Sequence, residues 1–514
     1  MKEFNYTGTC IPTQHYMVNT GYKLDKIIRL IDKNKYFTIN LPRQFGKTTS
    51  IYMLEELLKT KYLIISISFE GLGEIFFSEE EEFCKSIIPL FTKGYISDDK
   101  FFLEQLQLIG KTNKTFNELS NTISDICKTT KKKVILFIDE IDKASNYRLF
   151  LNFLGMLRNK YLLSKKNQDY TFHSVLLAGV HDIKNLKMKI RDERKSEYNS
   201  PWNIAIDFKV DMSFSVDEIS GMLAEYESDS HTGMDIKLIS RKLREYTSGY
   251  PYLVSKLCYL MDEELEQKFS IDSLEHAMRI LLNEHNTLFD DLIKNINRYP
   301  KLYNLLERIA IEGAEVTYNS DSHNLGIMYG ILSKNSKHKL IIHNKIFELR
   351  LYNYFIAERE IAKGSALNYK YEAKFIDDSG DLDMELILMK FQELMKAEYR
   401  DADEKFVERE GRLLFLAFLK PIINGEGFYF VEPETRKSSR MDIVVTFNQK
   451  KFVIELKIWR GEKYVQEGRE QLCNYLECQS LNKGYMVIFN FNKNKKYDLL
   501  NLKVNNKDIF EITV

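Results

Sequence analysis

The stretch "YFTINLPRQFGKTTS", Tyr36–Ser50, joins a short apolar segment to a helical pattern through a loop that contains one glycine. Gly46 allows the backbone to come close to an anion, and the amides at the start of the following helix point toward it. Lys47 can then reach the β and γ phosphates of a nucleotide, and the Thr48 hydroxyl can bind Mg²⁺. These residues match the end of a P-loop and predict an ATP-binding α/β domain.

The loop departs from the general P-loop pattern at one position. Leu41 stands where the first glycine would fall. Arg43 lies within the loop and can face phosphate, and Thr49 continues the helix start as a further candidate for nucleotide contact. The departure bears on ATP turnover more than on ATP binding.

The Gly-Lys-Thr sequence could stand at a helix start by chance. A second motif, "VILFIDEID" (Val134–Asp142), argues against that alternative. It is a buried apolar strand that ends in two acids, as a Walker B strand does. We expect Asp139 to hold Mg²⁺ through water and Glu140 to polarise the attacking water. Uninterrupted apolar strands that alternate with helical segments predict a parallel sheet covered on both faces.

Two weaker signals lie farther along the chain. "LLAGVHDI" ends a strand that we expect beside the Walker B strand, so His181 or Asp182 can sense the γ phosphate; both can equally be loop residues without a role. "TSGYPYL" resembles the Gly-x-Pro turn that places a helical lid near the nucleotide. Gly249 and Pro251 would serve its geometry.

Composition bounds the class of protein. The 514 residues carry a formal net charge of +0, which argues against a globally basic nucleic-acid coat and leaves a local basic patch open. The six cysteines form no CxxC pair, so neither a disulfide framework nor a zinc site is expected. The N-terminus has no apolar signal region and no stretch approaches a transmembrane length, so we expect a cytoplasmic protein without a membrane partner.

The length predicts several domains. Ser215 and Glu218 have a capping-box spacing and open a helical region. Farther on, two short strands around a polar loop follow helices, as in a winged helix. The predicted segments are an ATPase core at 1–210, a helical lid at 211–290, a winged-helix module at 291–365, a helical connector at 366–408 and a second α/β domain at 409–514.

The second α/β domain contains "MDIVVTFNQKKFVIELKIW" (Met441–Trp459), two apolar strands that carry three charges. Residues i and i+2 of a strand share a face, so Glu455 and Lys457 point the same way. Asp442 begins the neighbouring strand, and the three can converge. Two buried carboxylates need a cation between them, and oxygen ligands suit Mg²⁺.

We expect Asp442 and Glu455 to hold Mg²⁺, and Lys457 to orient water or stabilise developing charge during phosphodiester hydrolysis. An E-x-K triplet alone is common and is weak evidence for a metal site. The following helix strengthens this prediction, because its Gln471 and Tyr475 lie one turn apart. Glu410, at the start of the preceding helix, can add a carboxylate or only favour the helix dipole.

The segment from about His15 to Ser215 resembles the AAA-ATPase-like family of bacterial proteins. The last hundred residues resemble the PD-(D/E)xK nuclease superfamily, through "MDIVV", "IELK" and "QLCNY". This resemblance implies an ASCE-type ATPase fused to a restriction-endonuclease-like fold. The family context also suggests a part in defence or mobile-element biology.

These observations predict an ATP-gated, Mg²⁺-dependent nuclease whose partner is DNA. Two alternatives remain open. One is a nucleotide-dependent switch whose C-terminal domain grips nucleic acid or a partner without cleaving, which the Asp442, Glu455 and Lys457 triad disfavours. The other is a signalling ATPase that forms homo-oligomers through its lid and winged helix.

Overall fold

The computed structural model divides the chain into two compact units, Met1–Ala277 with Ile327–Gly330 and Met278–Gly326 with Ile331–Val514. The residues that it describes are 2–109, 113–145, 147–180, 202–208, 210–311, 314, 316–318, 321–363, 375–376, 381–398, 408–420, 422–423, 427–431, 442–447, 450–492 and 495–514.

The first unit is built on a five-stranded parallel sheet with the order β2-β3-β4-β1-β5. Its strands are β1 (Tyr36–Asn40), β2 (Leu63–Ser68), β3 (Val134–Asp139), β4 (Ser174–Gly179) and β5 (Ile206–Asp207). The expected parallel sheet is therefore confirmed. The strand of "LLAGV" lies directly beside the Walker B strand, because β4 pairs with β3 in parallel register.

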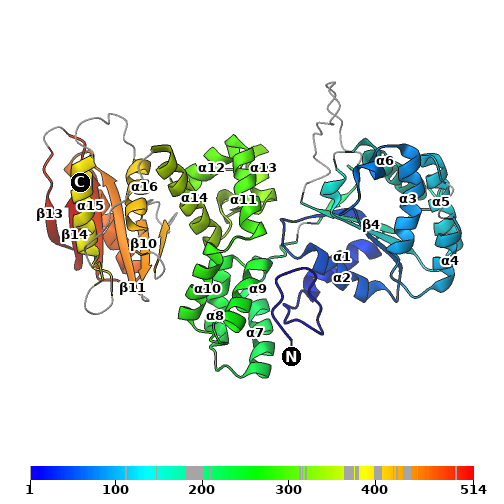
Figure 1. The fold of residues 1–514 in the computed structure, drawn as a ribbon, viewed down its shortest axis with the longest axis horizontal. Coiled ribbons are helices and arrows are strands. Elements are labelled where there is room, and N and C mark those ends of the chain that lie inside the picture. The colour runs from blue at the N-terminus through cyan, green and yellow to red at the C-terminus, as the bar shows by residue number, and fades with distance from the viewer. Residues whose placement is uncertain are drawn as a thin grey trace. The chain divides into compact units, whose positions relative to one another are not determined.

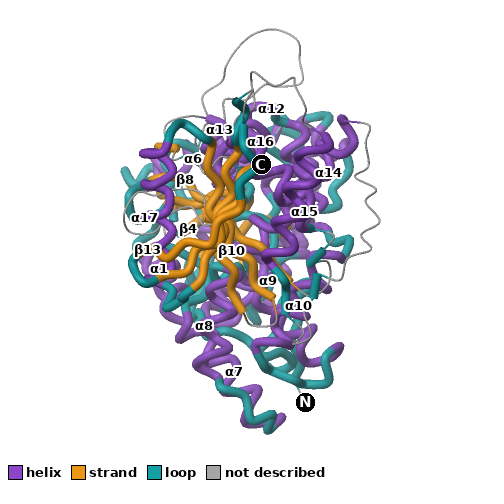
Figure 2. The backbone as a smooth tube through the Cα atoms, turned by 90° about the vertical axis from the view of Figure 1, so that its left-hand side faces the viewer, coloured by secondary structure: helices purple, strands orange, loops and turns teal. Residues whose placement is uncertain are grey.

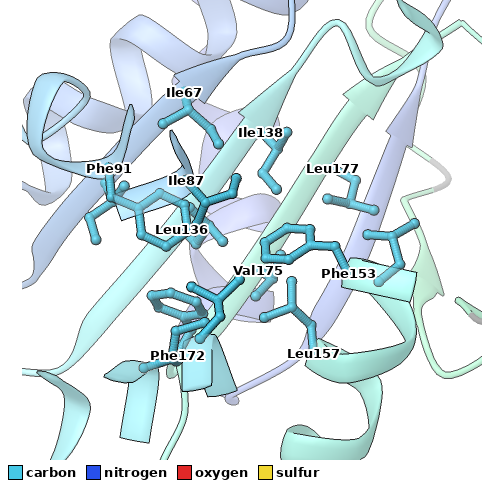
Figure 3. Close-up of a cluster of buried hydrophobic side chains, with 14 of the residues drawn as sticks. Ile67, Ile87, Phe91, Leu136, Ile138, Phe153, Leu157, Phe172, Val175 and Leu177 are labelled. Carbon is cyan, nitrogen blue, oxygen red and sulfur yellow. The ribbon is translucent and has the colours of Figure 1, made fainter. Parts of the chain in front are cut away.

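Helices cover both faces of this sheet (Figure 1). They are α1 (Gly21–Asp32), α2 (Lys47–Leu58), η1 (Glu74–Phe77), α3 (Glu80–Lys93), α4 (Lys100–Ile109), α5 (Phe116–Thr129), η2 (Ile141–Lys143) and α6 (Arg148–Ser164). The apolar residues of α1 and α2 pack on one face. Side chains of α3 and α6 pack on the other, where Figure 3 shows Phe91 and Phe153 over Leu136 of β3. Two buried faces explain why these strands are continuously apolar.

The sheet is followed by a helical region. Its helices are α7 (Val216–Ser230), α8 (Ile236–Thr247), α9 (Pro251–Tyr259), η3 (Leu260–Glu264) and α10 (Ile271–Asn283). The capping box is present at the start of α7, where the Ser215 hydroxyl accepts from the Glu218 amide and the Glu218 carboxylate accepts from the Ser215 amide. Pro251 occupies the first turn of α9, where a missing N–H costs nothing.

The second unit begins with helices and a small antiparallel sheet of order β6-β8-β7. The elements are α11 (Thr287–Arg298), α12 (Pro300–Ala310), β6 (Val316–Thr317), α13 (Asp321–Met328), β7 (Leu332–Lys334), β8 (Lys339–Ile342) and α14 (Lys345–Lys363). Leu302, Leu305, Leu306 and Ile309 recur at the spacing of one helix face and form the buried face of α12. The two expected strands form the β7–β8 hairpin, and its assignment as a winged helix stays a prediction.

The larger sheet of this unit is mixed, with the order β13-β14-β12-β11-β10-β9. Its elements are α15 (Met384–Glu398), α16 (Glu408–Leu419), β9 (Gly427–Val431), β10 (Asp442–Phe447), β11 (Lys450–Ile458), α17 (Glu462–Cys478), β12 (Lys483–Phe489), β13 (Leu499–Val504) and β14 (Lys507–Thr513). Apolar side chains of α17 pack on one face, and Phe391 of α15 contacts Phe489 on the other. Figure 2 shows α17 and α15 on opposite sides of the strands. The expected second α/β fold is confirmed.

The hairpin β13–β14 was not expected from the sequence. Asn505 and Asn506 form its turn with φ angles of 49° and 61°, the left-handed conformations that a two-residue hairpin turn requires. Because β14 pairs with both β12 and β13, it brings Glu511 into the interior of the sheet. No helix in the parts of the chain described above is long and apolar enough to cross a membrane.

His173, just before β4, is expected to make the first unit sensitive to mild acid. It is buried, stacks on Tyr62, and its Nε2 atom has no hydrogen-bond partner. Burial lowers the pKa of His173 from 6.5 to about 4, so the folded state favours the neutral ring. Stability from this group is full above pH 6.5 and is lost as the pH falls toward about 4. The loss should be about 1 to 3 kcal/mol after allowing for solvent screening.

The measurement is urea unfolding at several pH values for the wild type and His173→Phe, which cannot be protonated. The variant should lose less stability than the wild type between neutral and mildly acid pH. Parallel pH profiles for the two proteins would show that protonation of His173 does not oppose folding.

Candidate functional site

The phosphate loop lies between β1 and α2 in the first unit. Gly46 precedes α2 with φ 78° and ψ 19°, a left-handed conformation that glycine adopts without strain. Lys47 is buried, and its Nζ atom donates to the carbonyl oxygens of Leu41 and Pro42 at 3.1 and 3.0 Å. The backbone of the loop therefore surrounds the Lys47 ammonium. A bound phosphate would replace these two carbonyls as the acceptor of its hydrogen bonds.

The Walker A threonine and the Walker B aspartate meet directly. The Thr48 Oγ1 atom donates to Asp139 Oδ2 at 2.9 Å, and the Glu140 amide donates to Asp139 Oδ1 at 2.8 Å. A hydroxyl and a carboxylate side by side at the end of a strand are hard oxygen donors of the kind that Mg²⁺ prefers. The residues present at this position therefore fit the expected magnesium of a bound nucleotide.

Burial shapes the charges of this site. Burial lowers the pKa of Lys47, and the carboxylates of Glu140 and Asp139 oppose that shift. Burial raises the pKa of Glu140, and the Lys47 ammonium opposes it. The Glu140 backbone is itself unusual, with φ 52° and ψ 41°. A left-handed glutamate is strained, and such strain is typical of functional sites.

The Gly-x-Pro turn joins the helical region to the phosphate loop. Gly249 has φ 70°, and a Cβ atom there would stand 2.1 Å from the carbonyl oxygen of Phe214. The next residue, Tyr250, is fully buried; its hydroxyl donates to the Arg43 carbonyl and its ring contacts Phe45 edge-on at 4.8 Å. The turn thus touches the loop backbone directly, as the lid interpretation requires.

The other sequence candidates near the nucleotide have different surroundings. The Thr49 hydroxyl accepts a hydrogen bond from the Cys10 amide at 3.2 Å, so it ties the N-terminal segment to α2. Arg43 is exposed at the loop. His181 and Asp182 lie outside the described residues.

The second candidate site is on β11. Asp442 and Glu455 are directly opposite each other in the antiparallel register of β10 and β11. Glu455 is 1% exposed, and Lys457 Nζ lies 2.8 Å from its Oε1 atom. Lys457 also donates to Gln471 Oε1 of α17 at 2.8 Å. The expected convergence of Glu455 and Lys457 is therefore observed, whereas the side chain of Asp442 is not among those described.

Helix α17 is shaped to receive Lys457. A Cβ atom at Gly468 would stand 2.9 Å from Lys457 Cε and 2.8 Å from the methyl group of Met486, so a larger residue would displace the lysine stem. Gln471 follows one turn later and holds the ammonium, while Tyr475 is buried in the core between α17 and the sheet.

Sequence reasoning missed one charged pair in this region. Arg469 of α17 donates through Nε and an Nη atom to the two carboxylate oxygens of Glu511, both at 2.7 Å, and Glu511 is buried. Glu511 pairs in register with Met486, and Met486 pairs with Glu455. The Arg469–Glu511 ion pair therefore fixes α17 over the row of residues that contains Glu455. The pair was missed because the strand β14, which carries Glu511, was not expected.

The sequence predicts that a metal site at β11 also uses Asp442. Among the side chains that the structure describes, no group of three or more His, Cys, Asp or Glu could hold a metal ion. Neither Asp442 nor Glu410 belongs to that set of side chains. The buried carboxylate of Glu455, opposite an aspartate in the strand register, is an oxygen donor that fits Mg²⁺.

Comparison with curated proteins finds no match to this chain. Among solved structures, a Walker-type ATPase of Pyrococcus abyssi matches with 12% identity and a TM-score of 0.46, over 68% of this chain and 99% of that one. The ORC2 protein of Aeropyrum pernix, solved with ADPNP and ADP, matches with 10% identity and a TM-score of 0.38, over 69% and 98% of the two chains. The ORC1 protein of the same organism, solved with DNA, gives 11% identity and a TM-score of 0.28, over 68% and 95%. At these scores, function has to be argued from the residues of this chain.

Two segments match known families. Residues 57–188 match a family described as predicted AAA-ATPase, and residues 428–499 match the PD-(D/E)XK nuclease superfamily. The first match begins after the P-loop and contains the Walker B acids. The second contains Asp442, Glu455 and Lys457 of the β10–β11 hairpin and the Gln471 and Tyr475 pair of α17. Both resemblances are confirmed for these segments, so the chain joins an AAA-ATPase-like domain to a PD-(D/E)XK nuclease superfamily domain.

Proposed function

We propose that the chain is an ATP-binding, Mg²⁺-dependent nuclease that hydrolyses phosphodiester bonds in DNA, and that the nucleotide gates cleavage. One observation carries the proposal: Glu455 and Lys457 form a buried pair, opposite position 442 in the register, inside a segment that matches the nuclease superfamily. A buried ion pair is a poor device for stability alone, because desolvation offsets most of the attraction. A role in catalysis accounts for burying this pair.

In the nucleotide half, each residue has a task. Lys47 would exchange the carbonyls of Leu41 and Pro42 for phosphate oxygens, and the amides after Gly46 would donate to the same anion. Thr48 and Asp139 would hold Mg²⁺. The carboxylate of Glu140 would accept a hydrogen bond from the attacking water and so orient it.

In the nuclease half, Asp442 and Glu455 would hold Mg²⁺, which supplies Lewis-acid charge at the scissile phosphate when it is bound. Lys457 would donate to the attacking water or to a phosphate oxygen. Gln471 would keep the ammonium aimed, because their hydrogen bond is 2.8 Å long and crosses from helix to sheet. Strands and a packed helix fix these groups more rigidly than a loop would.

The test is to incubate the purified chain with Mg²⁺, with and without ATP, on linear duplex, circular duplex and single-stranded DNA and on RNA. DNA should be cleaved with Mg²⁺ and left intact in EDTA, and the rate should depend on ATP. Failure to cleave any of these substrates with Mg²⁺ or Mn²⁺, whatever the nucleotide, would reject the nuclease and favour a switch that only binds.

A further inference from the structure

The loop that follows β12 lies at the edge of the sheet where β11 ends, one residue after Lys457. β11, β12 and β14 are parallel, so their carboxyl ends share one edge. Ile458 is paired with Phe489, and the Trp459 amide donates to the Phe489 carbonyl at 2.8 Å. The chain therefore leaves β11 just after Lys457 and leaves β12 at the same level of the sheet. Lys457 contacts Gln471 of α17 on one face, whereas Phe489 contacts Phe391 of α15 on the other.

This loop combines rings and cations. The Nζ atoms of Lys396 and Lys495 lie 4.6 and 5.1 Å from the centroid of the Tyr497 ring. Lys495 also lies 5.8 Å from the Phe491 ring, which stacks on Phe489 at 6.5 Å with an interplanar angle of 7°. Tyr497, Phe491 and both lysines are partly exposed. The sequence from residue 490 to 498 holds three lysines and one aspartate, so its charge favours an anion.

Both ends of the loop are tied to the sheet. The Asn490 amide donates to the Val514 carbonyl, and the Thr513 amide donates to the Asp498 carbonyl, each at 2.9 Å. Within the loop, the Asn492 amide donates to Asn490 Oδ1 at 3.1 Å. The Tyr497 ring is therefore held next to an anchored residue, and less ordering is needed on binding than for a free loop.

These groups suit nucleotides whose bases are not paired. A lysine over an exposed ring is held weakly, whereas a nucleobase stacked on the ring is held more strongly and in a sequence-tolerant way. A base can thus displace the ammonium, which then contacts the adjoining phosphate. The faces of bases inside a duplex are already stacked, so a duplex offers this loop its phosphates alone.

We infer that Tyr497 and Phe491, with Lys495 and Lys396, form a stacking surface that binds an unpaired stretch of nucleic acid at the edge of the sheet where β11 and β12 end. This inference rests on the proposed nuclease function and specifies its substrate class. The surface would favour single strands, frayed ends or flaps over intact duplex.

The experiment measures fluorescence anisotropy of labelled dT20, labelled rU20 and a labelled 20-base-pair duplex in EDTA, where no cleavage occurs. Tyr497→Ala should weaken binding of the single strands about tenfold and change duplex binding less than twofold. Tyr497→Phe keeps the ring and should bind within about twofold of the wild type, which separates stacking from a lost hydroxyl. The rU20 arm shows whether the surface distinguishes RNA from DNA.

The matched control is Tyr22→Ala, because Tyr22 is 70% exposed and carries Lys26 Nζ 4.2 Å above its ring in the first unit. It should change no affinity. Wild-type affinity of Tyr497→Ala for dT20, an equal loss for duplex, or no binding of dT20 by the wild type would each overturn the inference. Cleavage of duplex DNA by the wild type with Mg²⁺ would leave the proposed nuclease standing in those cases, so the two failures are distinguishable.

Discussion

Replacing Lys457 with methionine is expected to lower the rate of DNA cleavage by about a hundredfold to a thousandfold, the usual loss when one preorganised charge donor is removed. Lys457 is buried between Glu455 and Gln471 at 2.8 Å from each, so no water can replace its ammonium without rearrangement. Methionine keeps the aliphatic stem that Gly468 makes room for. DNA affinity measured in EDTA should change little, because Lys457 acts on the reacting atoms.

The same strand offers a matched control. Lys451 also belongs to β11, and its Nζ atom donates to Gln479 Oε1 at 3.2 Å, but it is exposed. Lys451→Met should cleave at the wild-type rate. Thermal melting must show that both variants are folded, since Lys457→Met leaves a buried carboxylate beside an apolar group. Cleavage by folded Lys457→Met at the wild-type rate would remove this lysine from the mechanism.

The second large effect is expected when the nucleotide site is changed. Lys47→Ala should lower ATP affinity about tenfold to a hundredfold, because charge-assisted contacts to phosphate are lost. Glu140→Gln should bind ATP normally and hydrolyse it about a hundredfold or more slowly. If nucleotide gates the nuclease, the two variants must differ in DNA cleavage, since one cannot reach the ATP-bound state and the other is trapped in it. A complete switch needs about 5 kcal/mol of differential affinity between the two states.

The measurement is a cleavage time course for the wild type and both variants across an ATP titration. Lys59→Ala is the control, because Lys59 follows the same helix and makes only an exposed contact with Glu56 at 2.8 Å. It should respond to ATP as the wild type does. Equal rates for all four proteins, with and without ATP, would mean that the two domains act independently.

The parts of the sites that could be predicted from sequence are those that the local chain determines. Gly46 and Lys47 stand at a helix start, and the parity of β11 alone puts Glu455 and Lys457 on one face. Such relations need no knowledge of distant residues, and the structure places Gly46 and Lys47 at the start of α2 and Lys457 against Glu455. Thr48 and Asp139, each predicted to serve Mg²⁺, are hydrogen-bonded to each other, because parallel strands bring their carboxyl ends to one edge.

Contacts between residues far apart in the sequence were not predicted. The Arg469–Glu511 bond depends on β14 inserting between β12 and β13, a non-local pairing that the order of residues does not reveal. A signal did exist, since two asparagines between apolar runs favour a tight hairpin turn. The contact of Tyr250 with the Arg43 carbonyl likewise joins residues 207 positions apart.

The left-handed backbone of Glu140 implies a conflict between durability and activity. Glycine would adopt φ 52° without the steric cost that a glutamate bears, so Glu140→Gly should make the ATPase domain easier to keep folded while it removes the carboxylate. A laboratory selection that rewards heat resistance alone would therefore drift toward glycine at this position, and one that also rewards turnover would restore the acid. The amino acid recovered at residue 140 would thus report which of the two pressures had acted.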